Sequence, residues 1–310
     1  MSALICGSIA YDTVMVFPGR FREHILPDRI HMLNVAFLVP SMKRNFGGCA
    51  GNIAYNLGLL GGRGAPMATV GHDFDPYRRW MHSAGVSLER VRVLDGEFTA
   101  QAFITTDLDD NQITAFHPGA MGQSHLNRVP ADGSVTLGVV APDGRDGMVQ
   151  HAEQFAEAGI PWLFDPGQGL PMFDGPELLA FVAKATWVAV NDYEGQMLCE
   201  RTGLGLGEIA RRVKALIVTK GAQGSVIHAE GREFTIPAVR PSAVSDPTGC
   251  GDAYRAGLIH GLMNGMDWET TGRAASLMGA LKIAHTGTQN HRFTLDEFHG
   301  AFRAAFGRNP

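Results

Sequence analysis

The sequence predicts an α/β fold: a mostly parallel β-sheet, with a small second sheet that acts as a lid. Three observations support this fold class. Short apolar runs alternate with amphipathic stretches over most of the 310 residues, which is the pattern of βαβ units. Two segments interrupt that alternation and are rich in strand-forming residues. Hydrophobic residues make up 45% of the chain, which is enough for a sizeable buried core.

The main body is expected to consist of short strands that alternate with helices. The first strand lies at residues 3–9, and the first helix, at 52–60, ends at Gly61-Gly62 because consecutive glycines favour a helix stop. A helix at 73–84 likewise ends at Gly85. Further strands are expected at 65–70, 135–140, 162–164, 186–190 and 216–219, and further helices at 252–264, 268–285 and 295–306.

The lid is expected to come from the two segments that lack helical periodicity. One covers residues 13–46 and contains three prolines, and the other covers 98–118. The second segment contains two strands, 99–106 and 112–116, joined by the acidic turn Asp107-Leu-Asp-Asp-Asn111, which is the pattern of a hairpin. Extra strands inserted into an α/β body would form a small sheet over the carboxyl edge of the main sheet.

Composition and charge exclude several classes of function. The formal net charge is −5, whereas nucleic-acid-binding proteins usually present a basic surface. The four cysteines contain no CxxC pair, which favours a reduced, cytoplasmic protein over a secreted one. No apolar run reaches the ~18 residues of a membrane span, and the N-terminus lacks the basic start of a signal peptide. We therefore expect a cytoplasmic protein that binds neither nucleic acid nor membrane.

The segment Asp246-Pro-Thr-Gly-Cys-Gly-Asp252 has the composition of an anion-binding helix start. Two glycines flank one small residue where a loop is expected to enter the helix at 252–264. The free N–H groups of a first helical turn, together with the helix dipole, bind an anion such as a transferring phosphoryl group. Beside that position, Asp252 can accept a proton from an alcohol nucleophile. In isolation, the segment also fits an ordinary capped helix.

Two further segments carry residues suited to hydroxyl recognition. In Phe46-Gly-Gly-Cys-Ala-Gly-Asn52, Gly47 and Gly48 allow the backbone to approach a ligand, and Asn52 offers a donor and an acceptor to vicinal hydroxyls. Asp12 follows the first strand, at the edge where α/β sheets bind ligands, and a carboxylate accepts two hydroxyl protons. Each segment alone also has a structural alternative, helix packing for the first and a turn for the second.

Taken together and in this order, the segments resemble the PfkB, or ribokinase-like, family of carbohydrate and nucleoside kinases over nearly the whole chain. The family's GGxxxNxAxxLxxLG signature matches residues 47–61, and its DTxGAGDxFxAG-like signature matches 246–257. Asn191-Asp-Tyr-Glu194 matches the family's NxxE motif, and Thr219-Lys-Gly-Ala-Gln-Gly224 matches its TxGxxG nucleotide turn. Within the family, the chain looks closest to bacterial nucleoside kinases.

The resemblance implies a single ribokinase-like kinase domain over residues 1–310, with a three-layer α/β/α fold, a mostly parallel sheet, and lid insertions at about 13–46 and 98–118. It also implies a phosphotransferase that uses ATP. Asp252 would be the catalytic base, and the amides of Gly249, Cys250 and Gly251 would form the anion hole. The residues implied to hold the substrate are Asp12, Gly47, Gly48, Asn52, Phe103, Gln112 and Met121.

The resemblance also assigns the nucleotide and ion sites. ATP would be bound by Asn191, Thr219, Gly221, Gly224 and Gly251. Glu194 would order Mg²⁺ through water, and Asp246 stands where many relatives contribute to a site for K⁺. The chain departs from the family pattern at Pro247 and Cys250, where threonine and alanine are usual, but neither change removes an amide from the implied anion hole. No P-loop competes for the role, because none of the five lysines follows a glycine.

The expected acceptor is the 5′-hydroxyl of a ribonucleoside: adenosine, inosine or guanosine. The lid residues Phe37, Phe103, Phe116 and Met121 offer flat apolar surfaces for a purine. The same side chains fit the inner face of a half-buried sheet, which leaves a ribokinase- or fructokinase-like sugar kinase as the alternative. A third hypothesis, a non-catalytic nucleotide sensor, is disfavoured by the intact Asp252. Open edges of the lid sheet would allow either a monomer or a homodimer.

Overall fold

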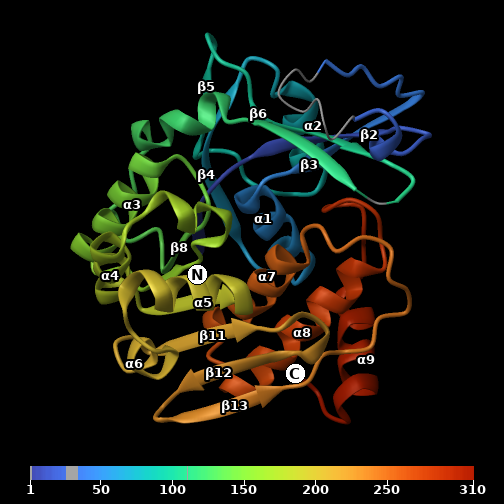
Figure 1. Ribbon diagram of the computed structural model, residues 1–310. Coiled ribbons are helices and arrows are strands. Elements are labelled where there is room, and N and C mark those ends of the chain that lie inside the picture. Colours follow the sequence, from blue (N-terminus) through green and yellow to red (C-terminus); the bar gives the residue numbers. More distant parts are fainter. Residues whose placement is uncertain (1, 26–33, 110) are drawn as a thin grey trace.

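The computed structural model describes residues 2–25, 34–109 and 111–310, and it confirms the predicted α/β fold (Figure 1). Within these residues, the main sheet has nine strands in the order β13-β12-β11-β10-β9-β8-β1-β4-β5. Neighbouring strands pair in parallel from β11 to β5, and antiparallel pairing adds β12 and β13 at one edge. These strands are β1 Ala3–Cys6, β4 Gly64–Gly71, β5 Val91–Leu94, β8 Leu137–Val140, β9 Trp162–Phe164, β10 Trp187–Asn191, β11 Ala215–Thr219, β12 Ser225–Ala229 and β13 Arg232–Ile236.

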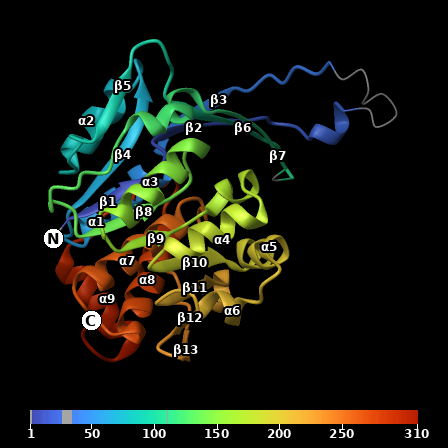
Figure 2. The ribbon, with the colours of Figure 1, turned by 90° about the vertical axis from the view of Figure 1, so that its left-hand side faces the viewer.

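Helices cover both faces of this sheet (Figure 2). They are α1 Cys49–Leu59, α2 Asp75–Ser83, α3 Arg145–Glu157, α4 Gly175–Lys184, α5 Asp192–Thr202, α6 Leu206–Ala210, α7 Cys250–Met263, α8 Trp268–Ile283 and α9 Leu295–Phe306. Short 3₁₀ helices lie at η1 Phe21–Glu23, η3 Gly119–Leu126, η4 Gly167–Met172 and η5 Gly221–Gln223.

Alternate residues of each buried strand contact different helix layers. In β1, Ala3 and Ile5 belong to the core cluster that α1, α2 and α7 cover, whereas Leu4 and Cys6 belong to the cluster that α3, α4 and α5 cover. This follows because successive side chains of a strand point to opposite faces, and a parallel sheet is normally buried on both. The predicted three-layer α/β/α arrangement is therefore confirmed.

The first strand and the first helix differ from their predicted bounds for one reason. β1 ends at Cys6 rather than at residue 9, because the chain leaves the main sheet there to enter the lid. At this exit, the Ser8 hydroxyl accepts a hydrogen bond from the Cys49 amide at 3.1 Å, and the Ser8 carbonyl accepts one from Ala50 at 3.0 Å. These bonds satisfy first-turn amides of α1, so the helix begins at Cys49, earlier than the predicted residue 52.

The lid is a four-stranded sheet in the order β3-β2-β6-β7. Its strands are β2 Ala10–Val16, β3 Ser41–Gly47, β6 Ala100–Thr106 and β7 Gln112–His117, and the sheet projects from the main body (Figure 2). β6 and β7 pair antiparallel, which confirms the predicted hairpin. Residues 26–33 of the predicted lid segment, and Asp110 in the predicted turn, lie outside the described residues.

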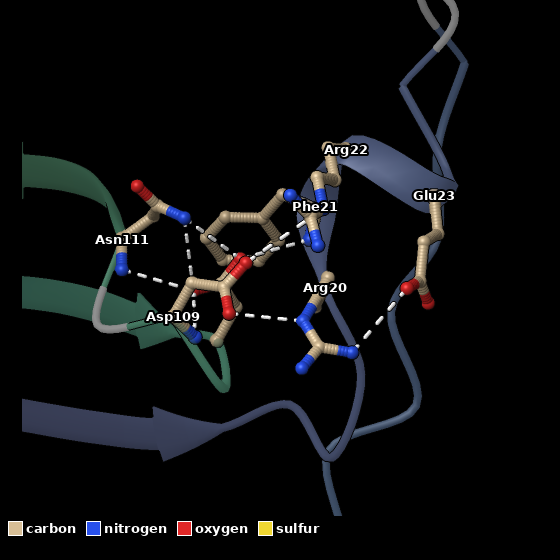
Figure 3. Close-up of polar contacts among 7 residues, drawn as sticks. Arg20, Phe21, Arg22, Glu23, Asp109 and Asn111 are labelled. Carbon is tan, nitrogen blue, oxygen red and sulfur yellow. Dashed lines mark hydrogen bonds and ion pairs between the residues drawn. The ribbon is translucent and has the colours of Figure 1, made fainter.

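The far end of the lid is held together by buried and ionic contacts (Figure 3). The Asp107 carboxylate accepts hydrogen bonds from the amides of Phe21, Asp109 and Asn111 at 2.9–3.0 Å. Hydrogen bonds of this kind favour the ionised form, and they lower the pKa of Asp107 to about 2 although burial opposes the shift. Arg20 adds an ion pair to Asp109, with Nε and Oδ1 2.9 Å apart. The turn of the hairpin is thereby fixed to the segment that follows β2.

Several elements were not predicted from the sequence. They are the helices α3, α4, α5 and α6, and the strands β5, β12 and β13. None of them changes the fold class: α3–α6 form the helix layer on the face opposite α1, α2 and α7, and β5, β12 and β13 extend the main sheet at its edges. Among the described helices, none combines the length and the apolar character that crossing a membrane would require.

Candidate active site

Three of the sequence motifs converge at the N-termini of α1 and α7. Asn52, in the first turn of α1, donates a hydrogen bond from Nδ2 to Oδ2 of Asp252 at 2.7 Å, although 200 positions separate the two residues. Asp252 lies in the first turn of α7. Asp12 lies in β2 and faces Gly47, since a Cβ atom built on Gly47 would collide with the Asp12 carboxylate. The structure thus brings Asp12, Gly47, Asn52 and Asp252 together.

The start of α7 leaves backbone amides open to a ligand. Gly249 is the N-cap, with a left-handed φ of 78° and no side-chain capping bond, and a Cβ there would approach Thr288 to 3.0 Å. Within the described part of the chain, the amides of Gly249 and Gly251 make no hydrogen bond. A Cβ built on Gly251 would meet nothing within 4 Å. Free amides at a helix N-terminus beside open space form an anion site.

Cys250 differs from its two neighbours in the implied anion hole. Its amide donates to the carbonyl of Pro247 at 3.1 Å, so this N–H closes the turn that precedes the helix. The Asp252 amide makes no hydrogen bond within the described residues. The amides of Gly249, Gly251 and Asp252 are therefore available to donate hydrogen bonds to an anion. The Cys250 amide instead stabilises the turn.

Asp252 is partly buried, and its surroundings bring its pKa close to neutral pH. Burial raises the pKa of this carboxyl, the hydrogen bond from Asn52 opposes the rise, and the nearby Asp165 adds to it, so that the pKa reaches about 7. A general base works best when its pKa lies close to the working pH. The position and the proton affinity of Asp252 both suit proton abstraction from a bound alcohol.

Asp12 and Gly48 lie where hydroxyl binding is predicted, next to Asn52 and Asp252. Burial, and then the charge of Asp246, raise the pKa of Asp12 to about 6, so this carboxylate is mostly ionised at neutral pH and can accept hydrogen bonds. Gly48 has a φ of 86°, and a Cβ at this position would collide with the backbone of residues 8–10. Glycine is required at 48 because of this close backbone approach.

A buried network that sequence reasoning missed fixes the orientation of Asn52. Gln289 donates from Nε2 to Oδ1 of Asn52 at 2.9 Å and to the hydroxyl of Tyr77 at 2.5 Å. Its own Oε1 accepts from Nε1 of Trp80 at 2.8 Å, and Tyr77 donates to the Gly47 carbonyl at 2.8 Å. The Oδ1 atom of Asn52 accepts from Gln289, and one N–H of its Nδ2 group donates to Asp252. The second N–H of this group remains available to a ligand.

The residues assigned to ATP and Mg²⁺ lie along the carboxyl edge of the main sheet. Asn191 ends β10 beside Thr219, which ends β11, and the two are register partners. Asn191 also caps α5: it accepts from the Glu194 amide at 2.7 Å and donates from its own amide to Oε2 of Glu194 at 2.8 Å. Gly221 and Gly224 follow β11 with φ of 54° and 88°. Ligands of α/β sheets bind at this edge.

A buried ion pair joins α7 to the carboxyl end of β9. It was not predicted from the sequence. Arg255 contacts Oδ1 of Asp165 through both Nε and Nη2 at 3.0 Å, and both side chains are buried. Burial lowers the pKa of Arg255, but the charges of Asp165 and Glu194 outweigh it, so the net shift is upward. Asp165 follows β9 at the carboxyl edge, which is the one sequence signal that could have indicated it.

The residues present fit a magnesium ion held mainly by other molecules. In residues 2–25, 34–109 and 111–310 no three His, Cys, Asp or Glu side chains gather as a metal site. Mg²⁺ typically keeps several waters and takes few protein ligands next to substrate phosphates. Burial raises the pKa of Glu194, and a cation beside this carboxylate would favour its ionised form.

The predicted substrate residues of the lid do not all lie on the face of the sheet that carries Asp12. Asp12 pairs with Ala102, and Ala102 pairs with Phe116, so Asp12 and Phe116 share a face of the sheet. Phe103 is one residue out of this row and lies on the opposite face, so the structure does not bring it to Asp12. Gln112 pairs with Thr106 at the end of the lid far from Asp12.

The remaining apolar residues of the predicted lid lie in two places. Met121 lies in η3, half-buried, and its carbonyl adjoins Gly144, just beyond the carboxyl end of β8. Phe37 packs against Phe17 and Phe21, with ring centroids 4.8 and 4.9 Å apart. This aromatic cluster belongs to the far end of the lid, so Phe116 and Met121 remain as the apolar candidates near the carboxyl edge.

Comparisons with known proteins agree with this fold. Residues 11–294 match the pfkB family carbohydrate kinases. The chain is 55% identical to Burkholderia thailandensis nucleoside kinase in complex with inosine, with a TM-score of 0.91 over 99% of both chains, and 57% identical to the same enzyme in complex with ADP-inosine, with a TM-score of 0.88 over 99% of this chain and 97% of that one. A nucleoside kinase of Methanothermobacter thermautotrophicus is 31% identical over 89% of this chain and 91% of its own length.

Proposed function

Because the chain belongs to the pfkB family of carbohydrate kinases, and is therefore a phosphotransferase that acts on an alcohol with ATP as co-substrate, we propose that its acceptor is the 5′-hydroxyl of a ribonucleoside: adenosine, inosine or guanosine. The observation that carries this proposal is the hydrogen-bonded pair of Asn52 and Asp252 beside the open amides of α7. The inosine complex of the B. thailandensis enzyme supports a purine nucleoside as the acceptor.

The ribose would be held by Asp12 and Asn52. The Asp12 carboxylate accepts hydrogen bonds from the 2′- and 3′-hydroxyls, and the free N–H of Asn52 donates to one of the same oxygens. The backbone at Gly47 and Gly48 lies against Asp12 without side chains, so the sugar can approach closely. Phe116, on the same face of the lid as Asp12, and Met121 offer apolar surface to the base.

Proton transfer would be the task of Asp252. As the 5′-oxygen forms its bond to the γ-phosphorus, the bond from that phosphorus to the bridging oxygen of ADP breaks, and the hydroxyl proton passes to the Asp252 carboxylate. The open amides at the start of α7 stabilise the charge on the transferring group. Positioning and electrostatic stabilisation account for most of the catalysis in this reaction class.

The nucleotide would lie along the edge formed by β10 and β11. Thr219 and the backbone of Gly221 and Gly224 line the side of ATP, and Asn191 adjoins them through the register of the two strands. Glu194 would hold Mg²⁺ through water. When bound, this ion would neutralise negative charge on the phosphates. Because Glu194 also caps α5, its carboxylate is already oriented before a nucleotide binds.

An acceptor screen tests the proposal and separates it from a sugar kinase. ADP formation would be measured by a coupled assay with adenosine, inosine, guanosine, their 2′-deoxy forms, ribose and fructose, each with and without Mg²⁺. A purine ribonucleoside should give the highest kcat/KM, and its 2′-deoxy form should be roughly 10- to 100-fold poorer, the cost of one hydrogen bond to a charged group. A free sugar as the best acceptor, or ATP binding without any acceptor, would refute the proposal.

A further inference from the structure

Lys282 is a fully buried lysine that contacts the turn in front of α7. It lies in the last turn of α8 with 0% of its surface exposed, and its Nζ donates to the main-chain carbonyl of Asp246 at 2.6 Å. The amides of Ser245 and Asp246 donate to the carbonyl of Ile283 at 2.8 and 3.2 Å. Burying an ammonium group is unfavourable unless it is paired, so its position under this turn calls for a functional reason.

The carboxyl groups of Asp246 and Asp252 lie close to Lys282. Burial lowers the pKa of Lys282, whereas Asp246, Cys250 and Asp252 raise it again. Asp252 is the proposed base, and Asp246 and Cys250 belong to the turn and the helix start that present the anion-binding amides. A positive charge at this point therefore lies next to the place where the phosphoryl group would pass.

The oxygen atoms of Asp246 already have hydrogen-bond donors. Oδ1 accepts from the Thr248 amide at 2.9 Å, Oδ2 from the Gly287 amide at 2.8 Å, and the carbonyl oxygen from Lys282. A potassium ion binds by replacing its hydration shell with such oxygens. At Asp246 it would share both carboxylate oxygens with amide donors and would meet the like charge of the ammonium group. These residues do not fit the K⁺ site that the family resemblance suggested.

We propose that Lys282 takes the place of the monovalent cation: its ammonium group holds the turn at Asp246 and supplies a fixed positive charge under the start of α7, so that phosphoryl transfer requires no potassium. This inference rests on the proposed phosphoryl transfer but not on the identity of the acceptor. Because Lys282 is 0% exposed, we assign it no direct contact with nucleotide or acceptor. It is a positioning residue, acting through Asp246 on the geometry of Gly249 and the amides that follow.

The first test uses the wild-type protein in chloride salts of K⁺, Na⁺ or tetramethylammonium at equal ionic strength. We expect kcat to change by less than about twofold among the salts, because the Lys282 ammonium group already takes the place of the cation. Thermal unfolding without nucleotide or acceptor supplies a readout independent of activity, since an ion that binds only the folded state raises Tm by mass action. No K⁺-specific rise in Tm is expected.

The second test removes the ammonium group with Lys282→Ala. We expect kcat to fall by roughly 10-fold, less than the ~10²–10³-fold loss of a direct oxyanion donor, while KM for the acceptor stays nearly constant. Ammonium, methylammonium or K⁺ should restore part of kcat and should raise the Tm of this variant specifically, whereas tetramethylammonium should do neither. Lys184→Ala is the matched control, because Lys184 is an exposed lysine paired with Glu153 at 3.2 Å.

Two results would overturn the inference. One is a wild-type protein whose kcat or Tm responds strongly to K⁺ but not to tetramethylammonium. The other is a folded Lys282→Ala variant with unchanged kcat, or with a loss that no small cation restores. Should Lys282→Ala fail to fold, the wild-type salt series decides alone. A wild-type protein inactive on all acceptors would refute the proposed function, while the Tm series would still report on Lys282.

Discussion

The Asn52 amide donates to the Asp252 carboxylate across 2.7 Å, and this bond joins the first turns of two helices that lie 200 residues apart in the chain. The contact lowers the pKa of Asp252 and so opposes part of the upward shift that burial causes. It also places the proposed base beside the residue proposed to hold the ribose. In the proposed function, acceptor binding and proton transfer would be coupled through the Asn52 side chain.

The pKa of Asp252 predicts the pH dependence of catalysis. Because only the ionised carboxylate accepts the proton, kcat/KM should rise with pH through about 7 and level off above it. The ionisation of Asp12, with a pKa of about 6, should steepen the acid side. The measurement is kcat/KM for the preferred acceptor from pH 5 to 9. A profile that is flat across this range would contradict the assignment.

The same pKa has a consequence for stability. The pKa of Asp252 in the folded state, about 7, lies above its ordinary value of 3.8. The folded state therefore binds the proton more tightly, and the stability that this proton contributes is lost as pH rises from about 4 to about 7. Asp252→Asn should accordingly unfold at a higher Tm than wild type at pH 8, and the difference should shrink toward pH 4.

Gly47 and Gly58 form a matched pair of glycines for mutation to alanine. At Gly47 the added methyl would collide with the Asp12 carboxylate, whereas at Gly58, in α1, it would meet nothing within 4 Å. Gly47→Ala should raise KM for the acceptor by roughly 10-fold, the effect of one weakened charged hydrogen bond. Gly58→Ala should keep normal kinetics and gain up to about 1 kcal/mol in unfolding free energy. Equal kinetic effects of the two changes would argue against a hydroxyl site at Asp12.

Gln289 is predicted to be a positioning residue for Asn52. In Gln289→Leu, the Asn52 carbonyl, the Tyr77 hydroxyl and the Trp80 indole would each lose a partner inside the protein. An unsatisfied buried polar group costs about 1–3 kcal/mol, so Tm should fall by several degrees. KM for the acceptor should rise as Asn52 loses its fixed orientation. Gln150→Leu, at an exposed position of α3, is the control and should change neither quantity.

The fold and the main motifs could be predicted because the glycines and the strand pattern are local signals. Gly249 has a positive φ, a conformation that favours glycine, and the predicted strands are short apolar runs. The helices α4 and α5 escaped prediction although each begins with a capping box, Asp174 with Glu177 and Asn191 with Glu194. That pattern can be recognised in a sequence, but at Asn191 the family motif assigns the same residues to the nucleotide site.

Other parts of the site depend on contacts between distant segments. Gln289 reaches Asn52 from 237 positions away, and the partners Asp165 and Arg255 are 90 apart, so no local pattern indicates either contact. The face to which Phe103 points depends on strand register, since a shift of one residue exchanges the two faces of a strand. The pairing of Asp12 with Ala102 decides this. The sequence of the helix around Lys282 likewise does not predict that this lysine is buried.

The central claim is that Asp252 accepts the proton of the acceptor hydroxyl, and Asp252→Asn tests it most directly. Asparagine can keep a hydrogen bond to Asn52 but cannot take the proton. We expect kcat to fall by at least ~10²-fold, the lower limit for loss of a general base, with KM for the acceptor nearly unchanged and the protein folded. A folded Asp252→Asn variant with turnover close to that of wild type would contradict the account.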